Sequence, residues 1–308
     1  MKNMADMDGW IWLDGDFIPW RDARVHVLTH TLHYGMGVFE GVRAYQTSEG
    51  TAIFRLHDHT DRLFRSAHIL NMPVPFTKAD LNQAQKQVLT KNNLAHAYIR
   101  PMCFYGSESM GIRADVLKTH VMVAAWEWPS YMGAEALEQG IKVRTSSYTR
   151  HHVNIAMCKA KANGNYMNSM LALHEAVKSG CEEALLLDNE GCVAEGSGEN
   201  IFLVIDGQLH TPEPTSCLAG ITRDAIIRFA AELGLTVKER RITRDEVYIA
   251  DEAFFTGTAA EVTPIRELDD RKIGSGKRGP VTTKLQAMYF DQVVGKRKGH
   301  YDDWLGYV

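Results

Sequence analysis

The segment Lys159–Tyr166 (KAKANGNY) is the stretch of this chain that decides most about its fold. Two lysines lie among small residues, and a stripe of apolar residues at helical spacing follows directly: Tyr166, Met170, Leu173 and Val177. The stripe stops before Gly180, which is expected to cap a helix in the left-handed conformation. A lysine on such a segment can be held rigidly and partly desolvated, and its amine can then form a Schiff base.

Downstream of this helix the pattern changes to short β-rich runs separated by turn residues. Turns are predicted at 189–191 and at Asp206-Gly207, a helix over Thr222–Leu233, and a capping box from Thr243 to Glu246 before another short helix. The predicted strands are Ala184–Leu187, Cys192–Glu195 and Asn200–Ile205.

Upstream, the chain opens with a hairpin signal, Trp10–Leu13 and Phe17-Ile18 around an Asp14-Gly15 turn. In the helix predicted at His57–Leu70, the apolar face leaves Arg62 free to point away from the packing. A second helix is predicted at Ala79–Leu89, with strands at Ala97–Pro101 and His120–Ala125.

A chain of 308 residues exceeds what one compact core usually serves, so two domains are expected. Residues 127–140 lose the regular period and hold Pro129 and Gly133, which places the boundary there. We expect an α+β fold with a smaller domain at 1–128, an interdomain loop at 129–137 and a larger domain at 138–308 that carries the reactive lysine. Strands and helices do not alternate strictly enough for a doubly wound sheet.

Composition excludes several classes of function. The net charge is −4 and the 34 basic residues are scattered, which argues against nucleic acid or an anionic membrane as partner; the one basic cluster, Lys296–Lys298, is short. Five cysteines form no Cys-x-x-Cys pair, and no apolar run approaches the length of a membrane span. Met1–Trp10 lacks the apolar core of a signal peptide, so a cytoplasmic enzyme is expected.

Three further segments could carry chemistry. Glu195–Asn200 (EGSGEN) places a carboxylate at a strand end beside glycines that let another molecule approach the backbone. Such a carboxylate could pair with a pyridinium nitrogen and keep that ring electron-poor. Gly220–Thr222 opens a helix whose free backbone N–H groups favour an anion, and Gly257–Ala260 is a second glycine-opened turn with a hydroxyl.

Taken together and in order, these segments resemble the fold-type IV aminotransferases that use pyridoxal phosphate, and within them the bacterial branched-chain amino acid aminotransferases. The resemblance spans nearly the whole chain. It rests on seven segments: 33–41 (HYGMGVFEG), 59–67 (HTDRLFRSA), 98–101 (YIRP), 161–166 (KANGNY), 195–200 (EGSGEN), 220–224 (GITRD) and 257–261 (GTAAE).

The resemblance assigns roles that spacing could not. Lys159 and Lys161 lie on the same side of an extended chain, and the family pattern of a lysine before x-x-Gly-Asn-Tyr selects Lys161 as the residue that carries the cofactor imine. It further implies that Lys161 shuttles the substrate proton and that the cofactor is pyridoxal 5'-phosphate. The implied cofactor contacts are Arg62, Ile221, Thr222 and Thr258 at the phosphate, Tyr166 at the phenolic oxygen, Glu195 at the ring nitrogen and Leu218 on the ring face.

For the substrate, the resemblance implies transamination between L-leucine, L-isoleucine or L-valine and 2-oxoglutarate. The implied substrate residues are Thr258, Ala259, Tyr98 and Arg100 at the carboxylate, with Phe39 and Tyr131 at the side chain. A pocket that also accepts glutamate must let its acid reach a cation, and our hypothesis is that Arg100, helped by Arg43, is that cation. A homo-oligomer is also implied, of a dimer or hexamer-of-dimers type. Two departures are Ala219, where the family often has proline, and differences within 106–113, the stretch that in the family reaches toward a neighbouring subunit.

Three other interpretations compete with this one. D-amino acid aminotransferases and aminodeoxychorismate lyase share the family, although the Tyr98-x-Arg100 pattern with Gly257–Ala260 favours L-substrates. Gly274–Gly279 reads literally as G-x-G-x-x-G, but no strand of useful length precedes it, so a dinucleotide site is not expected. The histidine pairs 57/59 and 151/152 have no companion ligands at metal-site spacing, and no metal is expected.

Overall fold

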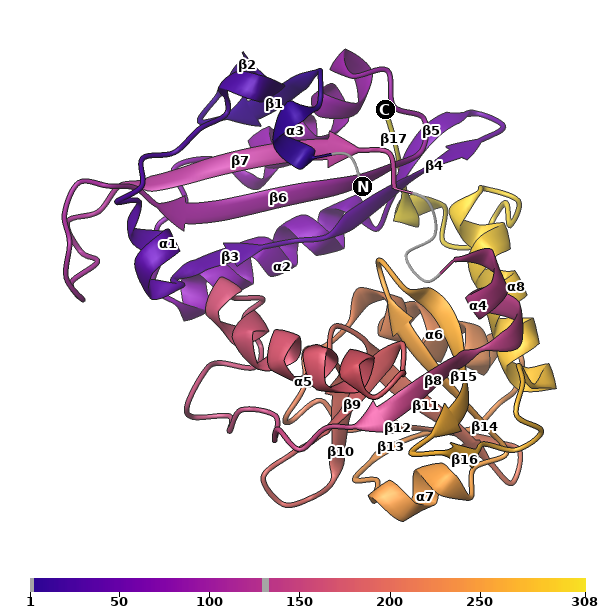
Figure 1. Cartoon of the computed structure of the whole chain (residues 1–308). Helices are drawn as coiled ribbons and strands as arrows, with labels where there is room; N and C mark the ends of the chain where they lie inside the picture. Colours follow the sequence, from indigo (N-terminus) through magenta and orange to yellow (C-terminus); the bar gives the residue numbers. More distant parts are fainter. Residues whose placement is uncertain (1–2, 129–132) are drawn as a thin grey trace. The chain divides into compact units, whose positions relative to one another are not determined.

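The computed structural model describes residues 3–128 and 133–308, in two compact units. The first unit comprises Met1–Trp128, Ala160–Gly164 and Val293–Val308, and the second comprises Pro129–Lys159 and Asn165–Gln292. Each unit has its own sheet and its own helices (Figure 1). Strands and helices are mixed in both, so the fold is α+β, as the sequence predicts.

The first unit is built on one largely antiparallel sheet. Its strands run in the order β17-β5-β4-β6-β7-β1-β2, with β3 paired to β6. The predicted N-terminal hairpin is confirmed, because Trp10 pairs with Pro19 and Leu13 with Asp16 around a turn at Asp14, whose φ is +51°. The strands are β1 (Trp10–Leu13), β2 (Asp16–Pro19), β3 (Gly37–Phe39), β4 (Val42–Thr47), β5 (Gly50–Phe54), β6 (Ala97–Tyr105), β7 (Thr119–Trp126) and β17 (Leu305–Tyr307).

Two helices pack on this sheet and complete its core. They are α2 (Leu56–Ile69) and α3 (Lys78–Lys91), close to the predicted ranges, and a short α1 (His30–Tyr34) precedes β3. Thr77 and Asp80 form a capping box at the start of α3. Leu63 and Ala67 are buried as predicted. Arg62 is buried too, against the prediction that it points away from the packing, because a buried carboxylate draws it inward.

The second unit is built on a mixed sheet in the order β10-β9-β8-β15-β14-β11-β12-β13, with β16 paired to β15. The predicted strands and turns of this region are confirmed, and Thr243 and Glu246 form the expected capping box. The strands are β8 (Ile141–Thr145), β9 (Glu183–Leu187), β10 (Val193–Gly196), β11 (Asn200–Ile205), β12 (Gln208–Pro212), β13 (Val237–Arg240), β14 (Glu252–Gly257), β15 (Glu261–Leu268) and β16 (Arg271–Lys272).

The helices of this unit are α4 (Ala134–Gln139), α5 (Tyr166–Lys178), α6 (Ile221–Glu232), α7 (Arg244–Tyr248) and α8 (Pro280–Val293). Helix α5 ends before Gly180, whose φ is +78°, as expected of a left-handed cap. Its buried face differs from the apolar stripe seen in the sequence. Ser169, Ala172 and Ala176 are buried, whereas Met170 and Val177 are 61% and 56% exposed, because the helix approaches β9 through small side chains.

The division of the chain differs from the continuous C-terminal domain expected at 138–308. Residues 293–308 return to the first unit because β17 pairs antiparallel with β5, Leu305 opposite Phe54. Ala160–Gly164, with Lys161, joins the same unit because Val38 and Ala162 form a bridge. The expected loop at 129–137 lies partly outside the described residues, and its end is the first turns of α4.

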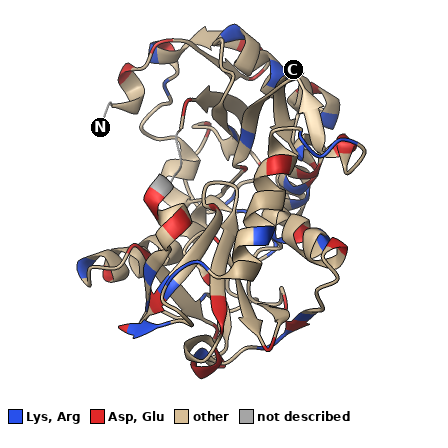
Figure 2. Cartoon of the chain, turned by 90° about the vertical axis from the view of Figure 1, so that its right-hand side faces the viewer, with Lys and Arg blue, Asp and Glu red and all other residues tan. Residues whose placement is uncertain are grey.

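Charge is interspersed along the chain: Figure 2 shows basic and acidic residues alternating over the ribbon. Within the residues that the structure describes, none of the helices combines the length and apolar character that a membrane crossing requires.

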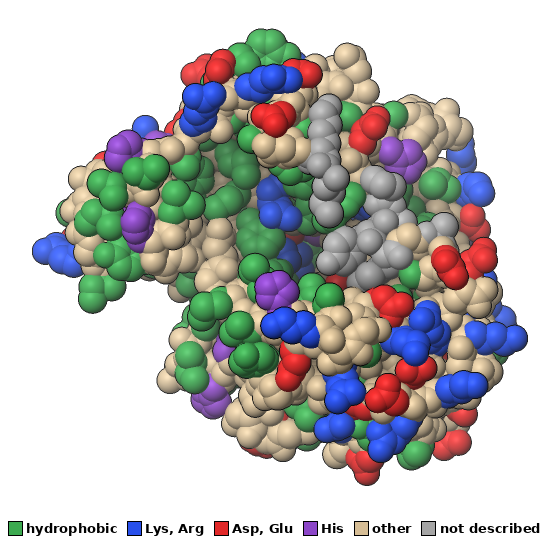
Figure 3. Space-filling model, viewed as in Figure 1, with side chains coloured by type: hydrophobic (Ala, Val, Ile, Leu, Met, Phe, Trp, Pro, Cys, Tyr) green, Lys and Arg blue, Asp and Glu red, His purple; other side chains and the backbone are tan. Residues whose placement is uncertain are grey.

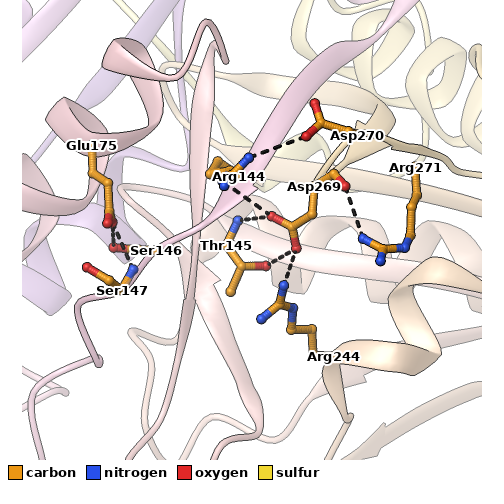
Figure 4. Close-up of a pocket in the computed structure, with 9 residues that line it drawn as sticks. All are labelled: Arg144, Thr145, Ser146, Ser147, Glu175, Arg244, Asp269, Asp270 and Arg271. Carbon is orange, nitrogen blue, oxygen red and sulfur yellow. Dashed lines mark hydrogen bonds and ion pairs between the residues drawn. The ribbon is translucent and has the colours of Figure 1, made fainter.

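A polar pocket of about 490 Å³ in the second unit is lined by several charged side chains of both signs. Thr145 and Arg244 converge on the Asp269 carboxylate, and Arg144 bridges toward Asp270 (Figure 4). Burial disfavours the Asp269 charge, but hydrogen bonds from Thr145 and Tyr248 and the charge of Arg244 outweigh it and lower the pKa. The pocket is therefore an ion-pair cluster that ties β8 to the turn after β15.

Candidate active site

Lys161 is held by the backbone of the first unit. Its carbonyl oxygen accepts from the Phe39 amide at 3.1 Å, and its own amide donates to the Ser66 hydroxyl at 3.0 Å. The Nζ atom lies 5.0 Å from the centroid of the Phe39 ring, in cation–π range. Lys159, the alternative, instead donates from Nζ to the Cys217 carbonyl at 3.2 Å within the second unit. The two lysines therefore have different surroundings despite their spacing of two.

Arg62 belongs to a buried network centred on Glu40. The Glu40 carboxylate accepts from Arg62 Nε at 2.6 Å and Nη2 at 2.9 Å, and it contacts His59 Nδ1 at 2.7 Å. Burial disfavours the Glu40 charge, but Arg62 and His59 outweigh it and lower the Glu40 pKa. Burial also lowers the His59 pKa, partly offset by Glu40, so the imidazole is neutral at pH 7. Glu40 therefore fixes the guanidinium plane of Arg62.

The predicted substrate residues of the first unit form a second group. The Arg100 guanidinium lies 4.6 Å from the Phe39 ring centroid and donates to the Tyr98 hydroxyl at 3.2 Å, while its buried Nε has no hydrogen-bond partner among the described residues. A Cβ at Gly41 would lie 2.0 Å from the Tyr98 hydroxyl, so glycine is required there. Arg43 instead donates to the Trp128 carbonyl at 2.7 Å. The Nε–H group of Arg100 is thus available to donate a hydrogen bond to another molecule.

In the second unit, the buried Glu195 lies in β10, one residue before the strand ends at Gly196. Its Oε1 lies 2.7 Å from Arg150 Nε, and its Oε2 accepts from the Leu218 amide at 3.2 Å. Arg150 reaches back to α5, where its Nη1 donates to Asn168 and Ser169. Glu195 is therefore a charged group held from two sides, with Leu218 beside it.

Helix α6 presents its N-terminus next to this carboxylate. Gly220 is the N-cap and supplies no side chain, and no described residue accepts a hydrogen bond from the amides of Ile221 and Thr222. Asn200 donates to the Leu218 carbonyl at 2.9 Å, and a Cβ at Gly220 would lie 2.0 Å from the Asn200 side-chain oxygen. Ala219 stands in this turn at the position where the family often has proline. Asn200 thus fixes the turn instead. Two open amides on a helix of this length favour an anion.

The remaining predicted residues lie at element ends in the second unit. Thr258 and Ala259 are half-buried in the turn between β14 and β15, where the Ala260 carbonyl accepts from Thr263 at 2.7 Å. Tyr166 is half-buried at the first position of α5. Tyr131 lies outside the described residues.

Two rival sites can be judged on geometry. Gly279 precedes α8, but the Glu252 carboxylate already accepts from the amides of Val281 and Thr282 at this helix start. An anionic carboxylate there repels phosphate. The G-x-G-x-x-G match therefore does not indicate a dinucleotide site. In the described part of the chain, no three His, Cys, Asp or Glu side chains are grouped to hold a metal ion.

Comparison with known proteins gives a consistent answer. Residues 37–268 match the family model described as amino-transferase class IV. The chain belongs to this family. It is 67% identical to the branched-chain-amino-acid aminotransferase of Pseudomonas aeruginosa, over 97% of each chain. It is 46% identical to the enzyme of that name from Escherichia coli K12, again over 97% of each.

Solved structures agree. The crystal structure of the T.th. branched-chain amino acid aminotransferase with pyridoxamine 5'-phosphate has a TM-score of 0.95 and 49% identity, covering 98% of this chain and 99% of that one. A structure of the same enzyme with N-(5'-phosphopyridoxyl)-L-glutamate has a TM-score of 0.93 and 47% identity, with 98% and 99% covered.

Sequence reasoning missed several residues of this class IV aminotransferase that the structure places beside the predicted ones. Glu40, His59 and Ser66 lie inside the quoted motifs, and a buried charge partner for Arg62 could have been sought there. Arg150 and Glu183 have no local signal, because Glu183 is placed by the pairing of β9 with β8 and Arg150 by its contacts with Glu195 and α5.

Glu40→Gln should destabilise the protein by about 3 kcal/mol, because it leaves the buried Arg62 guanidinium without its carboxylate. The free energy of unfolding in urea measures this. Glu49→Gln, which removes the exposed partner of Lys298 in the same unit, is the matched control and should change stability little. Equal losses for both variants would contradict the role given to Glu40.

Proposed function

We propose that this chain is a pyridoxal-phosphate-dependent branched-chain amino acid aminotransferase. It transfers the amino group of L-leucine, L-isoleucine or L-valine to 2-oxoglutarate and yields branched 2-oxo acids and glutamate. The observation that carries this is the 67% identity to the Pseudomonas aeruginosa relative over nearly the full length of both chains. The enzyme is further assigned to the cytoplasm, since five unpaired cysteines are typical of a reducing compartment.

The donor groups fit pyridoxal 5'-phosphate. A phosphate suits the Arg62 guanidinium and the open amides of Ile221 and Thr222, with the Thr258 hydroxyl as a further donor. A protonated ring nitrogen suits the Glu195 carboxylate, with Leu218 against the ring face and Tyr166 at the phenolic oxygen. When bound, the cofactor supplies an electron sink that acidifies the substrate α-carbon.

The chain's own residues do the rest. Lys161 would hold the cofactor through its amine, and the same amine would take the proton from the substrate α-carbon. Ala259 and Thr258 bind the substrate carboxylate through backbone N–H groups, with Tyr98 and Arg100 assisting. Phe39 lies under both the Lys161 ammonium and the Arg100 guanidinium, which makes it the apolar wall nearest these cations.

Lys161→Ala should abolish the visible band of the purified protein and reduce transamination by at least about 10³-fold, because the reactive amine is lost. Lys159→Ala is the matched control and should keep both the band and the activity, since its amine only contacts a carbonyl. Spectra before and after addition of L-leucine measure the half-reaction. Colourless wild-type protein that ignores added pyridoxal phosphate would refute the proposed function.

Arg100→Met should lower kcat/KM for glutamate more than for leucine, by about tenfold, because only glutamate brings a second carboxylate to the cation. Methionine keeps the packing against Phe39 while removing the charge. Steady-state kinetics with both donors measure the split. An equal loss on the two substrates would show that Arg100 serves only a structural or shared role.

A homo-oligomer is part of the proposal, supported by exposed apolar surface on each unit. Hydrophobic side chains gather over α1 and the loop joining β6 to β7, at the left of the view (Figure 3). The exposed apolar residues in these segments are Val27, Leu28, Leu32, Tyr34, Met110, Ile112 and Val116. In the second unit, exposed apolar residues occur in the stretch 148–177: Tyr148, Val153, Ile155, Met157, Met167, Met170, Leu171 and Val177. Apolar surface this extensive is typical of subunit interfaces.

Ile112→Asp should shift the protein toward monomer, because Ile112 is 90% exposed and a charge there would be buried on association. Sedimentation velocity measures the change. Ile249→Asp, at an exposed isoleucine (75%) outside both patches, is the control and should leave the assembly intact. Monomeric wild-type protein would contradict the assembly.

A further inference from the structure

The sheet of the second unit buries two carboxyl groups that the proposed reaction does not use. Glu183 begins β9 and is fully buried, and Glu199 precedes β11 with 6% of its surface exposed. The charge of Glu195, the residue assigned to the ring nitrogen, acts on Glu199, and Glu199 and Glu183 act on each other. Glu195 is itself paired with Arg150, at 2.7 Å from Oε1 to Nε.

The hydrogen bonds around the pair are unequal. Oε1 of Glu183 accepts from the Ala184 amide at 2.6 Å and from the Ser197 amide at 3.3 Å. Its other oxygen, Oε2, has no donor among the described residues. Oε2 of Glu199 accepts from the Gly198 amide at 3.0 Å. A buried carboxylate oxygen without a donor costs roughly as much as a lost hydrogen bond, so a donor is missing from this arrangement.

A proton on Glu199 supplies that donor. Two carboxyls in contact and out of water do not both ionise, because the second negative charge meets the first at low dielectric. Burial of Glu199, the charge of Glu183 and that of Glu195 all raise the Glu199 pKa well above its usual value, and only the Gly198 amide opposes them. Burial likewise raises the Glu183 pKa. These effects favour a pair that shares one proton and carries one negative charge.

The location of Glu199 links two predicted cofactor segments. Its Oε2 lies 2.9 Å from where a Cβ at Gly196 would be, directly over the turn that follows Glu195. Its Cγ lies 3.5 Å from the corresponding position at Gly257, which precedes Thr258. The Gly196 amide donates to the Glu199 carbonyl at 2.7 Å. Movement of this side chain would therefore disturb both turns.

We propose that Glu199 is a positioning residue: its carboxylic acid donates to Glu183 and holds the turn that carries Glu195, without adding a second negative charge beside it. This deepens the proposed function and rests on it for the role of Glu195. A neutral Glu199 leaves Glu195 paired with Arg150 on one side, so the cofactor ring nitrogen would meet a single carboxylate. An ionised Glu199 would compete with Glu195 for the proton on the ring nitrogen. Its repulsion of Glu195 would also loosen the turn.

The first test uses the apoprotein and needs no cofactor. Infrared spectra of wild type should contain the carbonyl stretch of a protonated carboxyl at pH 7, which Glu199→Gln removes and Glu138→Gln, at an exposed carboxylate on α4, retains. Glu183→Gln should also remove the band, because Glu199 then ionises against an amide donor. A band absent from wild type, or still present in Glu199→Gln, would overturn the inference.

Stability against pH gives a second readout. A carboxyl whose pKa is raised above 4.5 in the folded state takes up a proton on folding, so stability falls as pH rises from 4.5 through the folded pKa. Glu199→Gln cannot take up that proton. Its free energy of unfolding should therefore fall less steeply between pH 5 and 8, by about one proton of linkage, than that of wild type or Glu138→Gln. Equal slopes would contradict the shared proton.

A third test measures cofactor affinity, because the Glu183–Glu199 pair is proposed to position Glu195 for the cofactor. Glu199→Gln keeps a neutral donor and should bind pyridoxal phosphate within about twofold of wild type, whereas Glu199→Ala should bind at least about tenfold more weakly. Equal affinities for all three would overturn the positioning role. If wild type does not bind the cofactor while the infrared band behaves as expected, the proposed function fails and the proton on Glu199 stands. If wild type binds and the band is missing, only this inference fails.

Discussion

The backbone pairing between β3 and the Lys161 segment is the constraint on which the reactive end of the molecule depends. Phe39 donates to Lys161, and the Gly164 amide donates to Gly35 at 3.0 Å. A Cβ at Gly35 would lie only 3.3 Å from the Gly164 backbone, so the two chains approach as closely as glycine allows. The small residues between the lysines and the helix are therefore needed for packing: Ala160 and Ala162 are buried against the first unit.

Each unit contributes buried charge of one predominant sign. In the first, the buried arginines Arg43, Arg55 and Arg62 outnumber the buried carboxylate Glu40, which is paired with Arg62. In the second, Arg150 neutralises Glu195, and the carboxyl pair of Glu183 and Glu199 adds negative charge. An anionic phosphate has the sign opposite to the charge that predominates in the first unit, and a cationic ring nitrogen has the sign opposite to that of the second. The electrostatics thus agree with the cofactor reached from the family.

Much of the fold could be predicted from local signals, because a few neighbouring residues determine each turn, helix cap and strand. The Asp14-Gly15 hairpin, the capping box at Thr243 and the cap at Gly180 each depend on backbone preferences of one or two residues. The division of the chain could not be predicted, since Ala160–Gly164 joins the first unit through long-range hydrogen bonds. The burial of Arg62 could not be predicted for the same reason, because its partner, Glu40, lies 22 positions away in the sequence.

Helix α5 shows what hydrophobic periodicity measures. The stripe of Met170 and Val177 is a real amphipathic signal, yet within the chain the helix packs through Ala172 and Ala176. Close approach of a helix to a sheet favours small side chains, which carry little weight on a hydropathy scale. The large apolar residues then remain on the outside, where burial by a second copy of the chain gives them a partner. An apolar stripe in a sequence therefore indicates burial without indicating whether the covering surface belongs to the same molecule.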